Sequence, residues 1–209
     1  MVEINPIILH TRKGTPLRVL RPSEYDLLRN AVDNEPTRLL MDLLLYTGMR
    51  YIELCRVAEN PSWVREQSHT IYLSNEAQLK EQRKSPDRFV HLSREGWSAV
   101  SLFFMRVKDP KAELYTRRGF TKLLKTHAKN AGVSPEGLSA KTFRKSYESW
   151  LVQALVIRGQ QPSALSLIAK SFGHTETTAI SHYINLDFTK EDIDKIMVRT
   201  SGWMGNEAT

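Results

Sequence analysis

Four short polar segments interrupt or cap the apolar patterns of this sequence, and their residue types could hold an anion. They are Thr47-Gly48-Met49-Arg50 with Glu53, Lys141-Thr142-Phe143-Arg144, Gly173-His174, and Tyr183 nine residues later. A glutamate three residues after an arginine lies one helical turn away and can orient the guanidinium group. Two cations at the same spacing share a helix face and repel each other unless an anion lies between them. A histidine between two helices can donate a hydrogen bond to a phosphate oxygen, so the set is suited to binding a phosphate.

Each segment also has an ordinary structural interpretation, and taken singly the residues leave both interpretations open. The arginine and glutamate can form a helix end followed by a surface ion pair. The two cations can belong to a basic helix face. The histidine can satisfy the polar groups of a helix end, and the tyrosine can be a half-buried aromatic side chain.

The hydrophobic periodicity predicts a fold that is mostly α-helical with a small antiparallel β-sheet, an α+β class. Helical spacing dominates on both sides of residues 61–92, where short β-branched and aromatic pieces alternate with turn formers. Strands are expected at residues 63–64, 70–73 and 88–92. Helices are expected to begin at Pro22-Ser23, Pro36, Arg50, Ser93, Thr116, Ser139, residue 163, residue 175 and Thr189.

One domain accounts for most of the chain. Its 209 residues with 41% hydrophobic content are enough to bury a core. Residues 1–21 mix proline, glycine and basic residues without a sustained period, so we expect an N-terminal arm or linker there. A single domain is expected over residues 22–200, followed by a C-terminal tail at residues 201–209.

Composition and charge favour a polyanionic partner. Thirty Lys and Arg against twenty-three Asp and Glu give a net charge of +7, which suits nucleic acid, although the same surplus can simply keep a surface soluble. Cys55 is the only cysteine, so no intramolecular disulfide can form. No apolar run approaches membrane-spanning length and no apolar signal region opens the chain, so a cytoplasmic protein without a membrane partner is expected.

The order and spacing of the polar segments resemble a known family. The segments resemble the catalytic domain of the tyrosine recombinases, which include phage integrases and Xer recombinases. Their order is Thr-Gly-x-Arg-x-x-Glu, a basic β-hairpin, a cation-x-x-Arg, a Gly-His and a tyrosine nine residues later. The resemblance runs from residue 22 to residue 200, and its first and last parts are the specific ones. Most members have histidine where this chain has Lys141. Archaeal virus-type integrases are similar to it in carrying lysine there, which implies an archaeal mobile element.

The resemblance implies which residues carry the reaction. Arg50 corresponds to the first catalytic arginine of the family and Glu53 to the glutamate that supports it. Arg144 corresponds to the second arginine, His174 to the histidine and Tyr183 to the nucleophile. Rigid guanidinium donors can hold both non-bridging oxygens of a phosphodiester, where negative charge grows as the tyrosine attacks. The expected product is a 3′-phosphotyrosyl link and a free 5′-hydroxyl. Because that link keeps the bond energy, another DNA hydroxyl can reverse the attack without ATP or metal, so no cofactor is expected.

Lysines are expected to handle the protons of this reaction. Aligning residues 88–92 with the family's second hairpin strand puts Lys84 at the hairpin lysine, with Lys80 as the alternative. That lysine would protonate the leaving 5′-oxygen as general acid. Lys141 would favour the phenolate of Tyr183 through its positive field, or act as the base itself.

The resemblance also implies partners. Double-stranded DNA carrying an attachment or recombination site is the expected substrate, in the host cell and close to its nucleoid. A homotetramer on DNA is expected through exchange of the C-terminal helix around residues 192–198, with monomers when free. Family members usually carry a helical core-binding domain before this pattern, where only residues 1–21 stand here, so weak, salt-sensitive DNA binding is expected.

Two other functions fit part of the pattern. A type IB topoisomerase uses similar chemistry but rejoins the same strand, and the small size and the Gly-His to tyrosine segment argue against it. A non-catalytic DNA-binding protein on the same scaffold is the other alternative, and the filled catalytic positions weaken it.

Overall fold

The computed structural model describes residues 5–10, 14–75, 87–111, 114–159, 162–173, 175 and 186–203. The helices are α1 (Pro22–Asn30), α2 (Glu35–Thr47), α3 (Tyr51–Glu59), the 3-10 turn η1 (Pro61–Trp63), α4 (Arg94–Arg106), α5 (Arg117–Asn130), α6 (Ala140–Ile157), α7 (Pro162–Phe172) and α9 (Lys190–Arg199). The strands are β1 (Ile7–His10), β2 (Pro16–Val19), β3 (Val64–Arg65), β4 (Thr70–Leu73) and β5 (Arg88–His91). The mostly α-helical class with a small sheet is therefore confirmed. The helix expected from residue 175 falls almost wholly outside the described residues.

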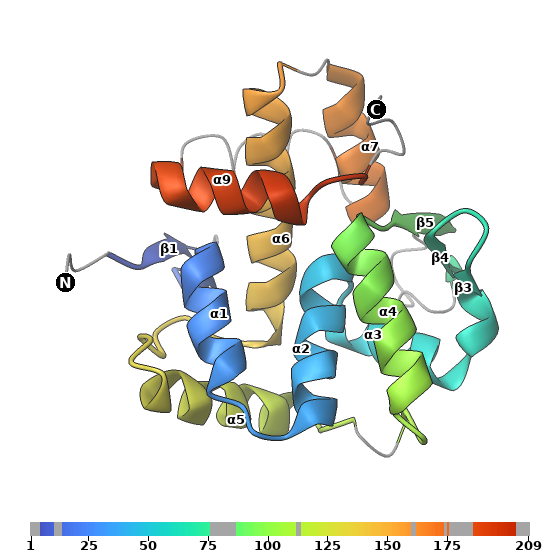
Figure 1. Cartoon of the computed structure of the whole chain (residues 1–209), viewed down its shortest axis with the longest axis horizontal. Helices are drawn as coiled ribbons and strands as arrows, with labels where there is room; N and C mark the ends of the chain where they lie inside the picture. Colours follow the sequence, from blue (N-terminus) through green and yellow to red (C-terminus); the bar gives the residue numbers. More distant parts are fainter. Residues whose placement is uncertain are drawn as a thin grey trace.

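α6 runs through the centre of the molecule and organises its core (Figure 1). It contacts α2, α7, α9 and β2, and its Phe143, Tyr147 and Trp150 are almost completely buried. Tyr25 of α1 packs edge-on against Phe143 and Trp150, with ring centroids 6.2 and 6.4 Å apart. Edge-to-face aromatic pairs stabilise a core beyond the area that they bury. None of the described helices is both long and apolar enough to cross a membrane.

Polar caps set the beginnings of most helices where the sequence predicts them. The side chains of four residues accept a hydrogen bond from a backbone N–H of the following first turn: Ser93, Thr116, Ser139 and Thr189. These bonds satisfy N–H groups that have no partner within the helix.

α1 and α2 are capped by residues that lie just before the predicted helix starts. α2 begins at Glu35 rather than Pro36 because the Asn34 side chain accepts from the N–H of Thr37 at 2.8 Å. α1 begins at Pro22, but its N-cap is Arg21, whose backbone N–H donates to Glu24 at 2.9 Å. α1 therefore begins where the sequence predicts.

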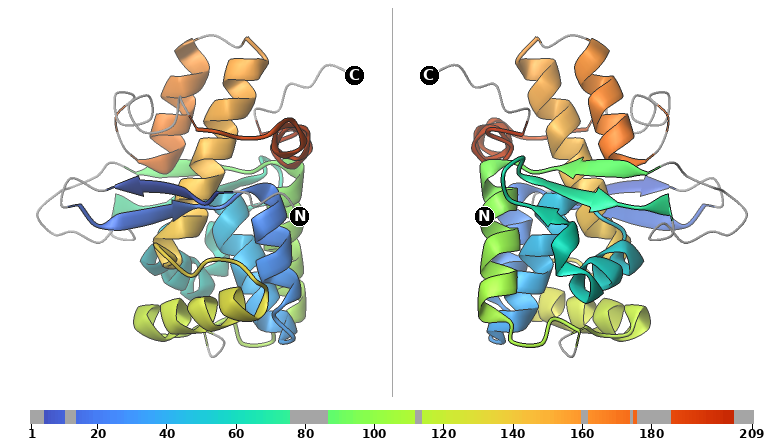
Figure 2. Two further views of the ribbon diagram at one scale, coloured as in Figure 1. Left: turned by 90° about the vertical axis from the view of Figure 1, so that its left-hand side faces the viewer. Right: turned by 90° about the vertical axis from the view of Figure 1, so that its right-hand side faces the viewer.

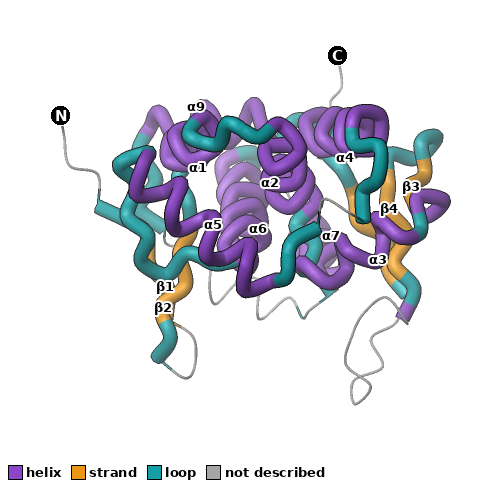
Figure 3. Tube along the Cα trace, turned by 90° about the horizontal axis from the view of Figure 1, so that it is seen from below, coloured by secondary structure: helices purple, strands orange, loops and turns teal. Residues whose placement is uncertain are grey.

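Two small antiparallel sheets lie at opposite ends of the helical body (Figure 3). The three-stranded sheet has the order β3-β4-β5 and is antiparallel, as the sequence predicts for the strands of residues 61–92. The second sheet is a β1-β2 hairpin within the expected arm, residues 1–21. It lies across α6 (Figure 2), where the Leu20 N–H donates to the Ser146 hydroxyl at 2.8 Å and the Trp150 indole donates to the Leu20 carbonyl at 3.0 Å. The sequence alone did not predict these strands because four-residue strands are too short to show a period, and their support comes from α6.

Candidate active site

The turn between α2 and α3 requires glycine for two reasons. Gly48 ends α2 in the left-handed conformation with φ of 59°, which side chains disfavour. A Cβ at this position would also lie 2.5 Å from Cε1 of the Phe172 ring. The glycine therefore lets the end of α7 pack directly on the turn that leads into Arg50.

Glu53 binds both the backbone and the side chain of Arg50, while part of that side chain remains exposed to solvent. It is the N-cap residue of α3, and its backbone N–H donates to Oε2 of Glu53 at 2.7 Å. Its guanidinium Nη1 lies 2.6 Å from Oε1 of the same carboxylate. The Arg50 side chain is 45% exposed while that of Glu53 is completely buried. Glu53 therefore contacts both the backbone and the guanidinium of Arg50, as their spacing allows, and the guanidinium group still reaches solvent.

Glu53 holds a second arginine that the sequence analysis did not single out. Nη2 of Arg88, the first residue of β5, lies 2.8 Å from Oε2 of Glu53, and its Nη1 donates to the backbone carbonyl of Ser171. Burial alone would raise the pKa of Glu53, but the charges of Arg88, Arg144 and Arg50 outweigh it and hold that pKa below its ordinary value. Glu53 is thus a carboxylate fixed between guanidinium groups.

Arg144 of α6 ties the ends of α2 and α7 together. Its Nη1 donates to the Gly48 carbonyl at 2.8 Å and its Nη2 donates to the Phe172 carbonyl. Its guanidinium carbon lies 5.0 Å from the centre of the Phe172 ring. Each carbonyl lies at the C-terminal end of a helix, where no N–H group of that helix can bond to it. The arginine therefore provides the missing hydrogen-bond donor at two helix ends. Two bonds leave further N–H groups of the same guanidinium available.

Positive charge exceeds negative charge in this cluster, which we call the arginine clamp: Arg50, Glu53, Arg88 and Arg144. Burial lowers the pKa of Arg144, and the nearby charge of Arg50 lowers it further, while Glu53 partly compensates. Three guanidinium groups thus share one clamp carboxylate. Such a surplus in a partly buried site favours binding of an anion, which would restore the balance.

Of the remaining predicted site residues, only Lys141 lies among the described residues. Lys141 lies in the first turn of α6, three residues before Arg144, and its side chain is exposed. Lys84, Lys80, His174 and Tyr183 lie outside the described residues. The chain reaches His174 from Gly173, which follows α7 in the left-handed conformation with φ of 66°.

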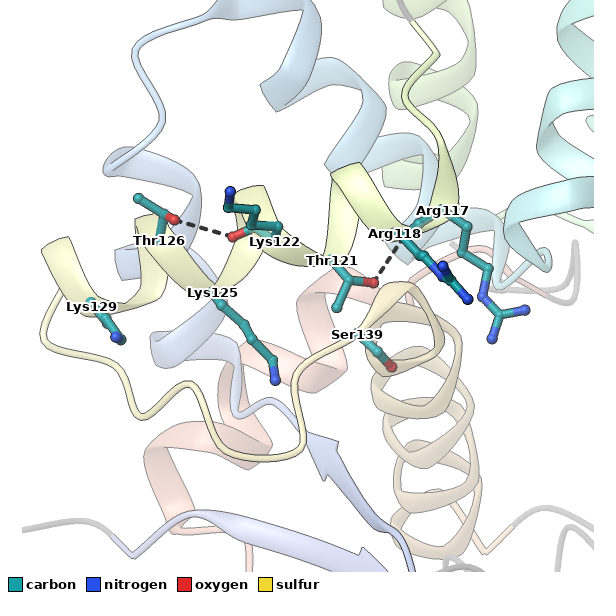
Figure 4. A pocket seen from close by; sticks show the side chains of 8 residues that line it. All are labelled: Arg117, Arg118, Thr121, Lys122, Lys125, Thr126, Lys129 and Ser139. Carbon is teal, nitrogen blue, oxygen red and sulfur yellow. Dashed lines mark hydrogen bonds between the residues drawn. The ribbon is translucent and has the colours of Figure 1, made fainter.

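A basic groove of about 640 Å³ lies between α5 and the start of α6 (Figure 4). It is lined by Arg117, Arg118, Thr121, Lys122, Lys125, Thr126, Lys129 and Ser139. Within the described residues, none of its five cations takes part in an ion pair. The groove is not part of the sequence prediction, although the recurrence of cations at residues 118, 122, 125 and 129 is a helical signal that could have indicated it.

Comparisons with known proteins concern the family and the fold of the chain. The family model described as "Phage integrase family" matches residues 18–190. No curated protein matches the chain. The crystal structure of XerA recombinase superposes with a TM-score of 0.57 at 18% identity, covering 90% of this chain and 64% of that one.

Structures of the Tn1549 transposon integrase bound to DNA are also similar. One, with a circular intermediate DNA, gives a TM-score of 0.61 at 15% identity, covering 95% of this chain and 67% of the other. Another, with transposon right end DNA, gives 0.57 at 18% identity, covering 87% and 65%. This chain therefore spans 64–67% of the length of these solved proteins, and at such identities the likeness concerns the fold.

Proposed function

We propose that this chain, which belongs to the phage integrase family of tyrosine recombinases, is a site-specific recombinase that cuts and rejoins DNA strands. The observation that carries the proposal is the arginine clamp. It combines an exposed guanidinium at Arg50, a buried one at Arg144 and a surplus of positive charge. A DNA phosphodiester is the anion that fits this surplus and the family.

The chemistry follows from what each clamp residue can donate. Arg50 and Arg144 would hold the non-bridging oxygens of the scissile phosphate, and His174 would add a further donor. Removal of one such fixed donor costs about 3 kcal/mol of transition-state stabilisation in other enzymes. Tyr183 would attack the phosphorus, forming a bond between its phenolic oxygen and the 3′-phosphate while the bond to the 5′-oxygen breaks.

Protons move in both halves of this step. The phenolic proton of Tyr183 must leave, and the exposed Lys141 would favour its loss through positive charge or accept it as base. The departing 5′-oxygen must gain a proton, which we assign to Lys84, with Lys80 as the alternative. The reverse sequence, with a 5′-hydroxyl from another strand as nucleophile, completes the exchange without metal or ATP.

The groove on α5 supports double-stranded DNA as the partner. Its five cations, which form no ion pair within the described part of the chain, lie beside Ser139, the cap of the helix that carries Lys141 and Arg144 (Figure 4). Lysine and arginine side chains bind DNA phosphates and release the counterions condensed on them. A duplex whose backbone follows α5 would therefore place an adjacent phosphate near the start of α6.

We assign the catalytic domain to residues 22–200, between an arm at residues 1–21 and a tail at residues 201–209. We further propose a homotetramer on DNA and monomers in its absence, with exchange through the C-terminal helix. The lysine at position 141 leads us to propose an archaeal mobile element as the source and host-cell nucleoid DNA as the place of action.

A nicked DNA substrate that traps the covalent intermediate tests the proposal. With the attachment sequence in the duplex, wild-type protein should become linked to the 3′ end, also in the presence of EDTA. Tyr183→Phe should bind the same DNA with the same affinity and form no adduct. An adduct in this variant, or a requirement for metal, would overturn the assignment. Joining of the trapped strand to a new 5′-hydroxyl separates a recombinase from an enzyme that only reseals its own nick.

A further inference from the structure

We infer that Arg88 is a positioning residue of the arginine clamp, which fixes Glu53, and through it Arg50, against the end of α7. This inference rests on the proposed function, because it assigns Arg88 a part in the reaction without contact with DNA. Arg88 is only 6% exposed, so it lies beneath the surface that a phosphodiester could reach.

Arg88 joins three elements that are distant along the chain. It begins β5, its Nη2 binds Glu53 of α3, and its Nη1 binds the carbonyl of Ser171 in α7. The backbone N–H of His91, on the same strand, also donates to the Ser171 hydroxyl at 3.2 Å. One guanidinium therefore sets the distance between the helix that carries Arg50 and the helix that leads to His174.

The two carboxylate oxygens of Glu53 have different hydrogen-bond partners. Oε1 holds the guanidinium of Arg50, while Oε2 is shared by the backbone N–H of Arg50 and the guanidinium of Arg88. Charge-assisted bonds of this kind are short and directional. Among the described residues, Arg88 is the buried cation that forms an ion pair with Glu53. Without it, the completely buried carboxylate would rotate towards its remaining donors, which would move Arg50.

The packing around Arg88 also constrains the residue before His174. A Cβ on Gly173 would lie 2.9 Å from Nε and 3.1 Å from Cδ of Arg88, so the backbone of Gly173 rests directly on this side chain. Nε of Arg88 is buried without a hydrogen-bond partner among the described residues. A buried donor left unpaired costs free energy. The Arg88 side chain therefore limits where the backbone of Gly173 can lie.

Arg18 offers a matched control. It is likewise a buried arginine on a strand, 1% exposed and ion-paired to Glu24, but it belongs to β2 and, among the described residues, forms no hydrogen bond or ion pair with the clamp. If Arg88 served only to stabilise the fold, its replacement would resemble replacement of Arg18.

The experiment compares Arg88→Met, Arg88→Lys and Arg18→Met with wild type. Cleavage of the nicked substrate is followed in a single turnover, and DNA affinity and thermal stability are measured on the same samples. Arg88→Met should cleave about 100-fold more slowly, as expected for a misplaced reacting group, with unchanged DNA affinity. Arg88→Lys keeps the charge but cannot bond to both Glu53 and Ser171, so its cleavage rate should lie between those of Arg88→Met and wild type. Arg18→Met should lose thermal stability and keep the wild-type rate per folded molecule.

The nitrogen-15 resonance of the Arg50 Nε–H group separates this inference from the proposed function. It can be assigned by its loss in Arg50→Lys. A shift or broadening of this signal in Arg88→Lys or Arg88→Met, and none in Arg18→Met, supports the inference even if wild-type protein forms no adduct, an outcome that would instead contradict the proposed function. An unchanged signal, or folded Arg88 variants that cleave at the wild-type rate, would overturn the inference.

Discussion

At the scale of single residues, Glu53 makes the arginine clamp depend on pH. Burial favours its neutral form, but Arg88, Arg144 and Arg50 favour the carboxylate more strongly, so its folded-state pKa lies below the ordinary value of 4.5. The stability that this carboxylate provides is fully present above that ordinary pKa. It is lost as the pH falls through the folded-state pKa, because the unfolded chain takes up the proton first.

Glu53→Gln should therefore lower stability at neutral pH and flatten its dependence on pH in acid. Removing one partner of a buried ion pair costs about 3–5 kcal/mol, since the other charges remain buried. Urea unfolding at a series of pH values from neutral to below 4.5 measures both effects. Glu191→Gln, which alters an exposed pair with Lys195, should leave the curve unchanged. Parallel pH curves for Glu53→Gln and wild type would contradict this account.

The pairing of Arg50 with Glu53 could be predicted from the sequence, but that of Arg88 could not. The first pair is local, since three residues in one helix bring the two side chains together. The second joins residues 35 positions apart through the contact of β5 with α3 and α7. In β5, Arg88 and Val90 are buried and Phe89 is exposed. An arginine at an inward position of a strand looks like a surface residue until its partner is known.

At the scale of elements, the contact of the α2–α3 turn with α7 should be intolerant of any side chain. Gly48→Ala combines an unfavourable positive φ with a Cβ placed against the Phe172 ring. Together, left-handed strain and overpacking should cost about 2–5 kcal/mol of unfolding free energy.

Gly132→Ala is the control for this change. Gly132 also has a positive φ, 68°, but a Cβ there would meet nothing within 4 Å. Its cost should be the backbone strain alone, about 1–2 kcal/mol. Chemical denaturation of the two variants distinguishes packing from strain, and equal losses would show that the Phe172 contact has no effect.

The cationic face of α5 should determine the salt dependence of DNA binding. Lys125→Ala removes one phosphate contact, which should weaken binding to all DNA sequences alike and reduce the salt slope by about 1. Lys195→Ala, on α9 and paired with Glu191, should change neither. Fluorescence anisotropy over a range of salt concentrations measures the slope. The same slope for Lys125→Ala and wild type would remove α5 from the DNA interface.

At the scale of the whole molecule, two ion pairs fasten the C-terminal helix to the N-terminal part of the chain. Asp192 of α9 lies 2.6 Å from Arg21, with both side chains buried, and Arg199 lies 2.6 Å from Asp26 of α1. α9 therefore packs on its own chain in this structure (Figure 1). Exchange of this helix between protomers, as proposed above, would have to break these pairs or re-form them with a neighbour.

Asp192→Asn should release α9 and lower the stability of the whole chain. It leaves the buried Arg21 without its acidic partner, at a cost of about 3–5 kcal/mol. Asp194→Asn, an exposed position on the same helix, should have no comparable effect. Thermal unfolding of both variants, together with their sedimentation behaviour, measures the change, and an unaltered melting temperature in Asp192→Asn would contradict it.

The helical framework was predictable because its helices are long enough to show a period and begin at polar caps. The ion pair that joins the two ends of the chain was not predictable, since Arg21 and Asp192 are 171 positions apart and no local spacing links them. The β1-β2 hairpin was missed for the same reason, because Leu20 finds its partners Ser146 and Trp150 only in the folded molecule.

The arginine clamp has a consequence for the timing of synthesis. Arg144 bonds to Gly48, 96 residues earlier, and to Phe172, 28 residues later, so its two bonds can exist together only once the chain has been made as far as Phe172. Domains fold as units once the necessary residues have left the ribosome. The complete arginine clamp therefore assembles only after α7 has been made, and the proposed reaction would have to wait until then.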